Sequence, residues 1–411
     1  MSAATTDIII AGAGPAGSYL AAALAATGLT VTVVDPNVDS PWPNRYGAWR
    51  HQWDKTPFKQ CISYSWPEVE HDFGDGAETV DGGYISVDTE ALRSTIRRAA
   101  SAATFIEDRV KSVSHSETGA VVTLASGALL SARLVVDATG SGMLTPRATH
   151  ASAYQHAYGL HIRTRSHPWS AERAMLMDFS DHHLDAAGRA EPPSFLYALA
   201  TSSTDVFVEE TSLAAAPPIP LAVLEARLRI RLKHLGVQID DILHVERCAI
   251  PMDLRPPTPG RIIAVGSAAG WVHPATGYQL TRTLTQIPAV ARAIHTGLQS
   301  SAIDASRAGW QAVWPTAQKR THALHQLGLG LLLTFDGAQT GTFFKNFFQT
   351  PVQDWRAYLD ATASPTTVAR SMAKVFASAP TDVRRHILRH AVGPGGGDLA
   401  QAVFPQLRGT R

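Results

Sequence analysis

The sequence predicts an α/β fold in which a domain with a mainly parallel sheet is interleaved with an antiparallel β-sheet domain and followed by a helical C-terminal region. Three patterns support this prediction. Residues 7–36 have the pattern of a strand, a glycine turn, a helix and a strand, residues 154–248 contain strands of alternating polarity, and the chain beyond Ser306 has the pattern of helices. A short apolar strand at residues 261–265 returns the chain to the first domain, so the domains are interleaved.

The length of 411 residues fits two or three domains. We expect the parallel-sheet domain to be discontinuous, over residues 1–150 and 245–305. The antiparallel sheet is expected over residues 151–244, and the helical region over residues 306–411.

The first glycine turn has the G-x-G-x-x-G spacing of a Rossmann-like dinucleotide site. Gly12 allows the tight turn, Gly14 allows close approach of a pyrophosphate, and Gly17 allows close packing of helix on strand. The helix N-terminus after Pro15 offers free N–H groups to phosphate, and Asp35 ends the second strand where a carboxylate accepts from a ribose hydroxyl. The motif alone does not separate FAD from NAD, but its position at the N-terminus favours FAD.

Two later segments are expected to return to the same nucleotide. The strand at residues 132–136 closes on Asp-Ala-Thr-Gly, which is typical of a second close backbone approach to a dinucleotide. The strand at residues 261–265 is followed by a segment rich in small residues. The cofactor-binding residues predicted in these segments are Asp137, Gly140, Gly266, Gly270 and Gly277.

Composition excludes several classes of function. The net charge of +1 gives no reason to expect nucleic acid as a partner. The two cysteines suit a reducing compartment, and the adjacent histidines His182 and His183 lack further ligands at metal-binding spacing, so we expect no metal site. The N-terminal residues lack the pattern of a signal peptide, and the longest apolar run, residues 327–335, is too short to span a bilayer. We expect a cytoplasmic protein that either stays in solution or lies on a membrane surface.

The loop at residues 36–53 is rich in proline and tryptophan. Its aromatic residues include Tyr46 and Trp49. They form either a hydrophobic plug over the first domain or an aromatic wall beside a ligand, where π faces stabilise positive charge.

Three acidic residues are candidates for proton transfer: Asp178, Glu209 and Glu210. Neighbouring residues on a strand point to opposite faces, so only one of the adjacent glutamates enters a given pocket. A carboxyl group buried beside Phe207 and Val208 would have a raised pKa and hold a proton to deliver. The alternative is a pair of solvated or salt-bridged glutamates.

The C-terminal region has more basic than acidic residues, and it contains the sequence FFKNFF at residues 343–348. These aromatic residues belong either to the core of a helical cap or to an amphipathic surface that contacts anionic lipid.

Several segments together resemble the plant and cyanobacterial type of lycopene cyclase. They include GAGPAG with Asp35, PWPNRYGAW, YQHAYG, HPWSAERAMLMDFSDHHL, PSFLYAL, FVEETSL, IPMDL, GWVHPATGYQLTRTL and FFKNFF, which extend over almost the whole chain. The glycine turn is shared by many flavoproteins, whereas FLYA, FxEET and HPxTGY together are specific.

The resemblance implies the fold of the glutathione-reductase/hydroxylase-like flavoproteins and a cyclisation without net redox change. FAD acts in its reduced form, with NAD(P)H as the reductant. A carboxylic acid protonates the end of a linear polyene, and the cation closes a ring. Glu209 matches the acid of the family, and Glu210 and Asp178 match further motif acids. The implied substrate is lycopene or a related polyprenoid. Because such a substrate resides in a membrane, we also expect the protein to contact a membrane peripherally. Substrate contacts are expected from Tyr46, Trp49, Tyr158, His273 and Tyr278.

The chain departs from the family pattern at two places. Arg50, His51 and Gln52 stand where the family has an acidic pair, and Thr89 follows Val87 and Asp88 where the family often has arginine. Loss of two carboxylates would change the charge near a cationic reaction, which leaves a different ring type or another polyprenoid substrate open. Two further functions remain: a flavin monooxygenase that uses NAD(P)H and oxygen, and a flavin-binding carotenoid carrier without catalysis.

Overall fold

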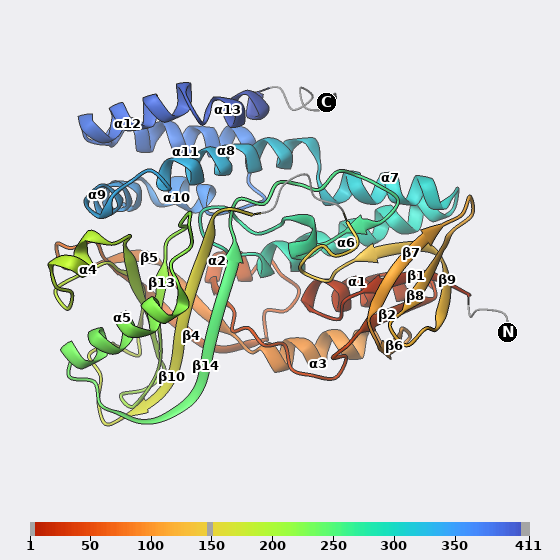
Figure 1. Ribbon diagram of the computed structural model, residues 1–411, viewed down its shortest axis with the longest axis horizontal. Coiled ribbons are helices and arrows are strands. Elements are labelled where there is room, and N and C mark those ends of the chain that lie inside the picture. Colours follow the sequence, from red (N-terminus) through yellow and green to blue (C-terminus); the bar gives the residue numbers. More distant parts are fainter. Residues whose placement is uncertain (1–4, 146–150, 404–411) are drawn as a thin grey trace.

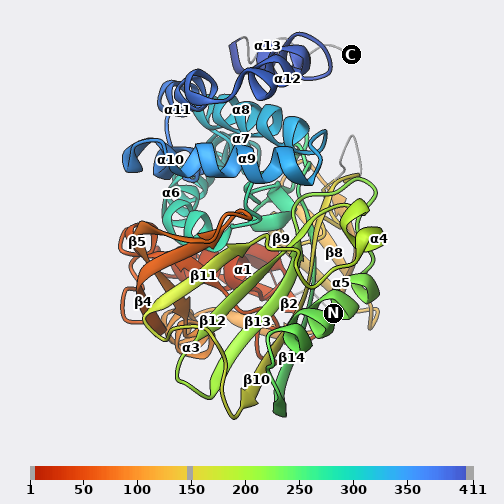
Figure 2. The same cartoon turned by 90° about the vertical axis from the view of Figure 1, so that its left-hand side faces the viewer.

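The computed structural model describes residues 5–145 and 151–403; the outermost residues of the expected domains, 1–4, 146–150 and 404–411, lie outside these ranges. The two sheets lie beside each other, and the C-terminal helices lie across one side of the antiparallel sheet (Figures 1 and 2). The predicted α/β class with a helical C-terminal region is confirmed.

The first sheet has the strand order β6-β2-β1-β9-β8-β7, with β15 paired to β9. Strands β1, β2, β6, β9 and β15 are parallel, and β7 and β8 form an antiparallel edge. The strands are β1 (Thr5–Ala11), β2 (Val31–Asp35), β6 (Thr104–Glu107), β7 (Val110–His115), β8 (Ala120–Leu124), β9 (Leu129–Asp137) and β15 (Ile263–Ala264). Ile8, Ile9 and Ile10 are fully buried, which is expected of a parallel strand covered on both faces.

Helices complete this parallel-sheet domain. They are α1 (Pro15–Ala25), α3 (Thr89–Ala99), η1 (Gly266–Ala269), α6 (Leu280–Leu298) and α7 (Ala302–Val313). Trp310 and Val313 of α7 share one core with Ile8 and Ile10. The domain therefore continues past the expected boundary at residue 305, because the apolar face of α7 is buried here.

The second sheet has the order β14-β10-β13-β12-β11-β4-β5-β3 and is antiparallel except for the β4–β11 pair. Its strands are β3 (Gly47–Trp49), β4 (Ile62–Asp72), β5 (Ala77–Val87), β10 (Tyr154–Thr164), β11 (Arg173–Asp178), β12 (Ser194–Ala200), β13 (Asp205–Ser212) and β14 (Ile239–Pro251). Helix α5 (Leu221–His234) packs on β10 and β13, and the short helices are α2 (Arg50–Trp53) and α4 (Ala186–Ala190).

This sheet corrects the expected domain boundaries. Residues 47–87 were assigned to the first domain, but β3, β4 and β5 pair within the second sheet, and β14 crosses the expected boundary at residue 245. A strand's own sequence does not specify its partner, so the β4–β11 pair joins segments that are about a hundred residues apart without a local signal.

Up to residue 403, where the described chain ends, six helices follow: α8 (Thr316–Leu332), α9 (Gly337–Phe348), α10 (Val352–Tyr358), α11 (Pro365–Ser378), α12 (Thr381–Val392) and α13 (Gly396–Val403). Asp336 begins α9 with a capping box, in which its side chain accepts from the N–H of Gln339. The phenylalanines of α9 pack inward against the antiparallel sheet: Phe347 belongs to the same buried cluster as Trp49, and Phe344 to the same cluster as Phe195. Of the two readings of this segment, the structure therefore supports a core role for the aromatic residues. Within the described ranges, no helix is both long and apolar enough to cross a membrane.

Candidate active site

One large cavity, of about 830 Å³, is formed jointly by the two sheets and the C-terminal helices. The parallel-sheet domain contributes Gly14 and Asp35, the antiparallel sheet contributes Glu209, and α9 contributes Phe344 and Phe347. A single cavity thus joins the predicted dinucleotide site to the predicted proton donor.

The glycine turn has the geometry that a pyrophosphate needs. Gly12 has φ +108°, and a Cβ atom here or at Gly17 would overlap the backbone of Ala138 or of Gly12. Gly14 precedes the first residue of α1, and the space beside its Cα is open to the cavity. The N-terminus of an eleven-residue helix, with its free N–H groups, therefore borders the cavity next to Pro15.

Asp35 lies at this same end of the cavity. Its Oδ2 accepts from the N–H of Ala13 at 2.8 Å, and its Oδ1 accepts from the N–H of Asn37 at 2.7 Å. These bonds hold the carboxylate at the end of β2, where the sequence placed it for a ribose hydroxyl.

The later segments divide into residues that line the cavity and residues that shape it. Gly140 and Gly277 line it. Asp137 does not: it is fully buried, and its oxygens accept from the backbone N–H groups of Thr139, Leu144 and Thr145. The prediction that Asp137 binds the cofactor is corrected, because this carboxylate is already saturated and instead holds the turn that carries Gly140.

Gly266 and Gly270 also lie behind the cavity wall. Both have positive φ, and a Cβ on Gly266 would lie 2.8 Å from the Cβ of Ala16 on α1. Gly266 therefore allows close packing of η1 against α1, and Gly270 ends η1 beside the backbone of Leu254 and Arg255. The predicted direct contact of both glycines with the cofactor is corrected to these structural roles.

Glu209 faces the cavity from the middle of β13. Its Oε1 accepts from the hydroxyl of Thr211 at 2.8 Å, and its Oε2 lies against Gly159 on β10. Burial, together with the nearby charge of Glu246, raises the pKa of Glu209 to about 8. This carboxyl is therefore protonated at neutral pH and can donate a proton into an apolar space.

Aromatic side chains form the walls around Glu209. Trp49, Tyr46 and Tyr278, from which substrate contacts are expected, line the cavity. The hydroxyl of Tyr197 donates to Tyr84 at 3.0 Å, and the hydroxyls of Tyr84 and Tyr278 lie 2.8 Å apart. Burial raises the pKa values of these three tyrosines well above the usual value. The hydroxyl groups hence bond to each other as neutral phenols, and the rings remain as π surfaces at the cavity wall.

Glu210 and Asp178 lie on the opposite side of β13, away from the cavity. Arg231 of α5 bonds Glu210 through Nε, at 3.0 Å to Oε2, and its Nη1 lies 3.6 Å from Oδ2 of Asp178. Ser194 also donates to Glu210 at 2.6 Å. The predicted catalytic roles of these two acids are corrected: strand alternation sends Glu210 to the face packed on α5, where both carboxyls belong to an ion-pair network.

Tyr158 and His273 are also absent from the lining of the cavity. The Tyr158 side chain lies on the face of β10 that packs on α5, and its hydroxyl donates to Glu225 at 3.0 Å. His273 is buried beside His325, and its Nε2 lies 3.1 Å from the carbonyl oxygen of Tyr358. Their predicted substrate contacts are therefore corrected to structural contacts.

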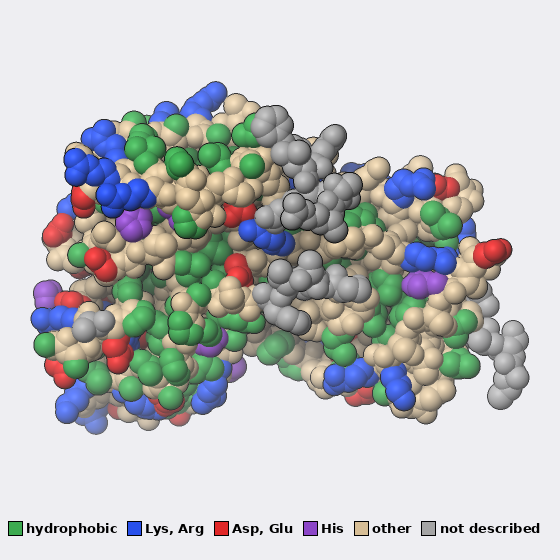
Figure 3. Space-filling view, turned by 45° about the horizontal axis from the view of Figure 1, so that its top comes forward, with side chains coloured by type: hydrophobic (Ala, Val, Ile, Leu, Met, Phe, Trp, Pro, Cys, Tyr) green, Lys and Arg blue, Asp and Glu red, His purple; other side chains and the backbone are tan. Residues whose placement is uncertain are grey.

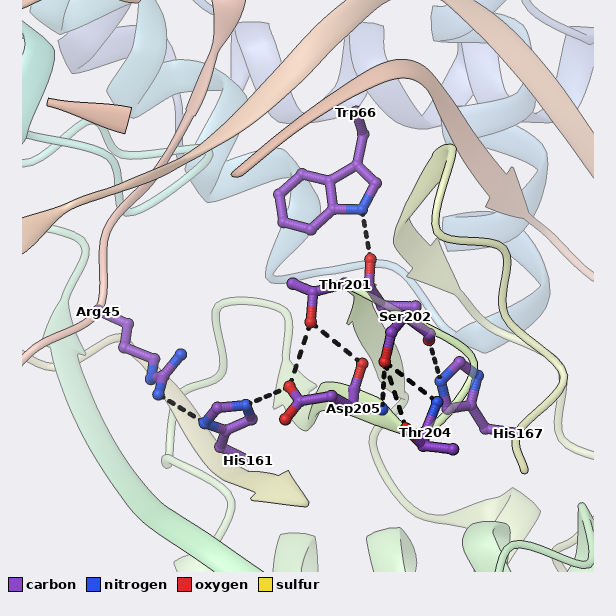
Figure 4. Close-up of polar contacts among 9 residues, drawn as sticks. Arg45, Trp66, His161, His167, Thr201, Ser202, Thr204 and Asp205 are labelled. Atoms are coloured by element: carbon purple, nitrogen blue, oxygen red, sulfur yellow. Dashed lines mark hydrogen bonds and ion pairs between the residues drawn. The ribbon is translucent and has the colours of Figure 1, made fainter. Parts of the chain in front are cut away.

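Arg45, His161 and Thr201 line the cavity, and a polar network joins them to Asp205 (Figure 4). His161 bridges two charged side chains, with Nδ1 2.8 Å from Nη2 of Arg45 and Nε2 2.6 Å from Oδ1 of Asp205. Thr201 donates to the same Asp205 oxygen at 3.2 Å. The sequence analysis did not identify this network, because its members come from the loop before β3, from β10, from the turn after β12 and from β13.

Glu246 on β14 is a second acid in the cavity wall that the sequence analysis missed. Every residue from Glu246 to Pro251 lines the cavity, so alternation along β14 does not single out Glu246.

The residues that replace the family's acidic pair lie outside the cavity lining. Arg50 pairs with Asp54 at 2.9 Å, and Gln52 donates to the carbonyl oxygen of Leu359 at 3.1 Å. Burial and the nearby charges of Arg356 and Lys55 lower the pKa of His51 to about 4. These three residues therefore lie outside the surface that faces a ligand. At the second departure, Asp88 caps α3 by accepting from the N–H of Ala91 at 2.9 Å.

Sequence comparison gives a consistent family. A family profile described as lycopene cyclase protein matches residues 7–385. Lycopene beta cyclase of Synechococcus elongatus is 36% identical over 389 residues, which cover 92% of this chain and 94% of that protein. An uncharacterized carotenoid cyclase of Deinococcus radiodurans is 36% identical over 393 residues, covering 95% of each. Lycopene beta cyclase of Arabidopsis thaliana is 32% identical over 372 residues, covering 86% of this chain and 74% of that protein.

Structural comparison gives the fold. A geranylgeranyl bacteriochlorophyll reductase-like protein of Thermoplasma acidophilum has a TM-score of 0.69 at 15% identity, covering 94% of this chain and 99% of its own. A flavoprotein/dehydrogenase of Cytophaga hutchinsonii has a TM-score of 0.63 at 12% identity, covering 95% and 100%. At these identities the likeness establishes the flavoprotein fold of the chain.

Proposed function

Because the chain belongs to the lycopene cyclase family, we propose that it cyclises the end of a linear carotene, lycopene or a close relative, without net oxidation or reduction. The reaction is an isomerisation of the intramolecular lyase type. The observation that carries this proposal is Glu209: a carboxyl protonated at neutral pH, its pKa raised to about 8 by burial and the charge of Glu246, in the wall of an aromatic-lined cavity.

The reaction begins with transfer of the Glu209 proton to the terminal double bond of the polyene. The tertiary cation that results is attacked by the neighbouring internal double bond, which forms the carbon–carbon bond of a six-membered ring. Loss of a proton from the ring cation gives a neutral product with the composition of the substrate. Proton donors of this kind contribute about 10²–10⁴-fold to rate.

The cavity wall protects and stabilises the cation. Trp49 and Tyr278 offer π faces to positive charge. The tyrosine hydroxyls are hydrogen-bonded to one another, so they are poorly placed to trap the cation. Phe343, Phe344 and Phe347 give the apolar surface along which the hydrocarbon would lie and keep water away.

The nucleotide end of the cavity fits FAD. The open space at Gly14 beside the N-terminus of α1 would receive the pyrophosphate, and Asp35 would accept from the ribose. Reduced FAD, when bound, supplies an electron-rich ring system that stabilises nearby positive charge. We propose NAD(P)H as the source of its reducing equivalents.

Two glycine variants separate binding of FAD from folding. We expect Gly14→Ala to leave the apoprotein as stable as the wild type and to weaken FAD binding by more than tenfold, because the added methyl group enters open space that the pyrophosphate needs. Gly17→Ala should instead lower thermal stability, because its Cβ would overlap the backbone of Gly12. Flavin absorbance and thermal unfolding of the two apoproteins measure both effects. Equal FAD affinity of Gly14→Ala and wild type would contradict this assignment.

A membrane-soluble substrate suggests where the protein works. We propose a cytoplasmic enzyme that contacts membranes peripherally through α12 and α13. Lys and Arg side chains gather over this end of the helical region, beside hydrophobic ones (Figure 3). The exposed residues are Arg384, Arg385, Leu388, Arg389, Val392, Leu399 and Val403.

Charge reversal tests this surface. Arg384→Glu with Arg385→Glu should weaken binding to vesicles of phosphatidylcholine and phosphatidylglycerol by more than tenfold, because each basic residue near an anionic surface contributes about 1 kcal/mol. Arg165→Glu, on an exposed arginine of the antiparallel-sheet domain, is the matched control and should change binding little. Sedimentation with the vesicles measures the bound fraction. Unchanged binding of the double variant would exclude this contact surface.

A pigment profile tests the activity itself. A lycopene-producing bacterial host that expresses the chain should accumulate ring-bearing carotene in place of lycopene. Lycopene left unchanged while the flavoprotein is present in folded form would contradict the proposal.

A further inference from the structure

Two carboxyl groups face the cavity on either side of one glycine. Gly159 on β10 pairs with Glu209 on β13 and with Glu246 on β14, so the three residues lie in one row across the sheet. Neighbouring strands are about 4.8 Å apart, which places the backbones of the two glutamates about 10 Å from each other. A Cβ on Gly159 would lie 3.2 Å from Oε2 of Glu209 and 2.6 Å from the ring of Phe207. The missing side chain thus leaves space between the two acids.

Glu246 is held differently from Glu209. Its Oε1 accepts from the backbone N–H of Arg45 at 3.2 Å and from the thiol of Cys248 at 3.4 Å. Its Oε2 is buried and has no hydrogen-bond partner among the described residues. The residue is only 6% exposed, although it lines the cavity. One oxygen of this carboxyl is therefore fixed, and the other is available to a proton from a ligand.

More groups oppose the rise in pKa at Glu246 than at Glu209. Burial raises the pKa of both groups, but the Arg45 N–H, the Cys248 thiol and the charges of Arg45 and His244 act against it at Glu246. At Glu209 the charge of Glu246 raises the pKa further, and only Thr211 opposes it. Two nearby carboxyls that share one proton are the arrangement expected of an acid and a base.

Building on the proposed cyclase function, we infer that Glu246 is the proton acceptor that removes the ring proton after cyclisation, and that it forms a donor–acceptor pair with Glu209 across Gly159. The proton of Glu209 moves to the terminal alkene carbon, and the new carbon–carbon bond forms. A C–H bond of the ring cation then breaks, its electrons form the ring double bond, and its proton passes to Glu246. Return of one proton from Glu246 to Glu209 through water restores the starting state, and no oxidant or reductant is consumed.

This assignment predicts two limbs in the pH dependence of ring formation. The rate should fall as pH rises through about 8, because Glu209 must be protonated, and it should fall at acidic pH as Glu246 takes up a proton. The titratable or charged groups facing Glu246 are Arg45, Tyr46, Tyr197, Glu209, His244 and Cys248. A His244→Gln variant, which removes the histidine that faces Glu246, should keep both limbs.

Glu246→Gln in D₂O gives the sharpest test, with lycopene, reduced FAD and the purified protein. The wild type should place one deuterium in each ring that it closes. The variant should form rings at least 100-fold more slowly and lose the acidic limb, yet return deuterium to the recovered acyclic substrate, because Glu209 still protonates it and the cation reverts. Glu246→Asp should restore part of the rate and the acidic limb. Glu225→Gln, a glutamate outside the cavity that bonds Tyr158 and Arg229, is the control and should match the wild type.

Other outcomes overturn the inference. Full ring formation by Glu246→Gln would show that another group accepts the proton. Loss of both ring formation and deuterium exchange, with FAD binding and thermal stability intact, would show that Glu246 acts only through Glu209. A wild type that closes no rings would overturn the proposed function, and the role of Glu246 with it.

Discussion

Glu209→Gln is expected to abolish ring closure, by at least 100-fold, while the protein keeps its fold and its FAD. The amide has nearly the same size and can still accept from Thr211, but it has no proton to give. FAD binding should persist, because Glu209 lies on β13 and the nucleotide end is formed by Gly14 and Asp35. Product analysis by chromatography and the flavin spectrum of the purified variant measure the two effects.

Stability is the internal control for this variant. The folded pKa of Glu209 is raised above the ordinary value of 4.5, so between that value and about 8 the unfolded chain releases a proton that the folded protein retains. The free energy of unfolding of the wild type therefore falls as pH rises through this window. The glutamine variant has no carboxyl to titrate at this position, so its free energy of unfolding at pH 8 should be at least that of the wild type. Retained activity in the variant would exclude Glu209 as the donor, and an unaltered pigment profile would favour a carrier without catalysis.

Arg231→Met should lower the free energy of unfolding by about 3–5 kcal/mol, because it leaves the buried carboxylate of Glu210 without its partner. Arg231 and Glu210 are almost completely buried, and Asp178 also loses its nearest cation. Burial already raises the pKa of Asp178, while Arg231 opposes the rise, so removal of the arginine should raise it further. Urea denaturation at neutral pH measures the change.

The matched control lies two residues away on the same helix. Arg229→Met removes an exposed pair with Glu225, four residues earlier, and should cost only about 0.3–0.5 kcal/mol. Equal effects of the two substitutions would show that the Arg231 network does not stabilise the fold.

The local patterns were sufficient to predict the parallel-sheet domain. The local sequence of residues 7–36 determines their strand–turn–helix geometry, because Gly12 and Gly17 occupy positions where any side chain would overlap the backbone. The long-range pairing was not predictable in the same way. Strands β4 and β5 have ordinary strand sequences, and their place in the second sheet depends on pairing with β11, far along the chain. The end of the first domain was missed because α7 looks like other C-terminal helices, although it is buried against β9 and β15.

The candidate site shows the same division. Strand alternation correctly predicted that only one of Glu209 and Glu210 enters the pocket. The preceding residues Phe207 and Val208 indicated that the surroundings of this carboxyl would be apolar. The sequence did not reveal that Arg231 would neutralise the other face, nor that Gly159 would place Glu246 in line with Glu209. Those relations arise from three strands and a helix meeting in space.

The departures from the family pattern have less effect on the site than their charge suggests. Arg50, His51 and Gln52 belong to α2, and none of them lines the cavity. The carboxyl groups that the cavity does contain are Glu209, Glu246 and Asp35. Because Glu209 is protonated at neutral pH, the negative charge in the cavity wall comes from Glu246 and Asp35, and Arg45 and Arg247 contribute positive charge.

The most direct test is to incubate the purified protein with chemically reduced FAD and lycopene in the absence of oxygen, and to analyse the products by chromatography and mass spectrometry. The account predicts a ring-bearing carotene with the mass of lycopene, formed without oxygen. Lycopene recovered unchanged, or converted only when oxygen is admitted and to a product of higher mass, would contradict it.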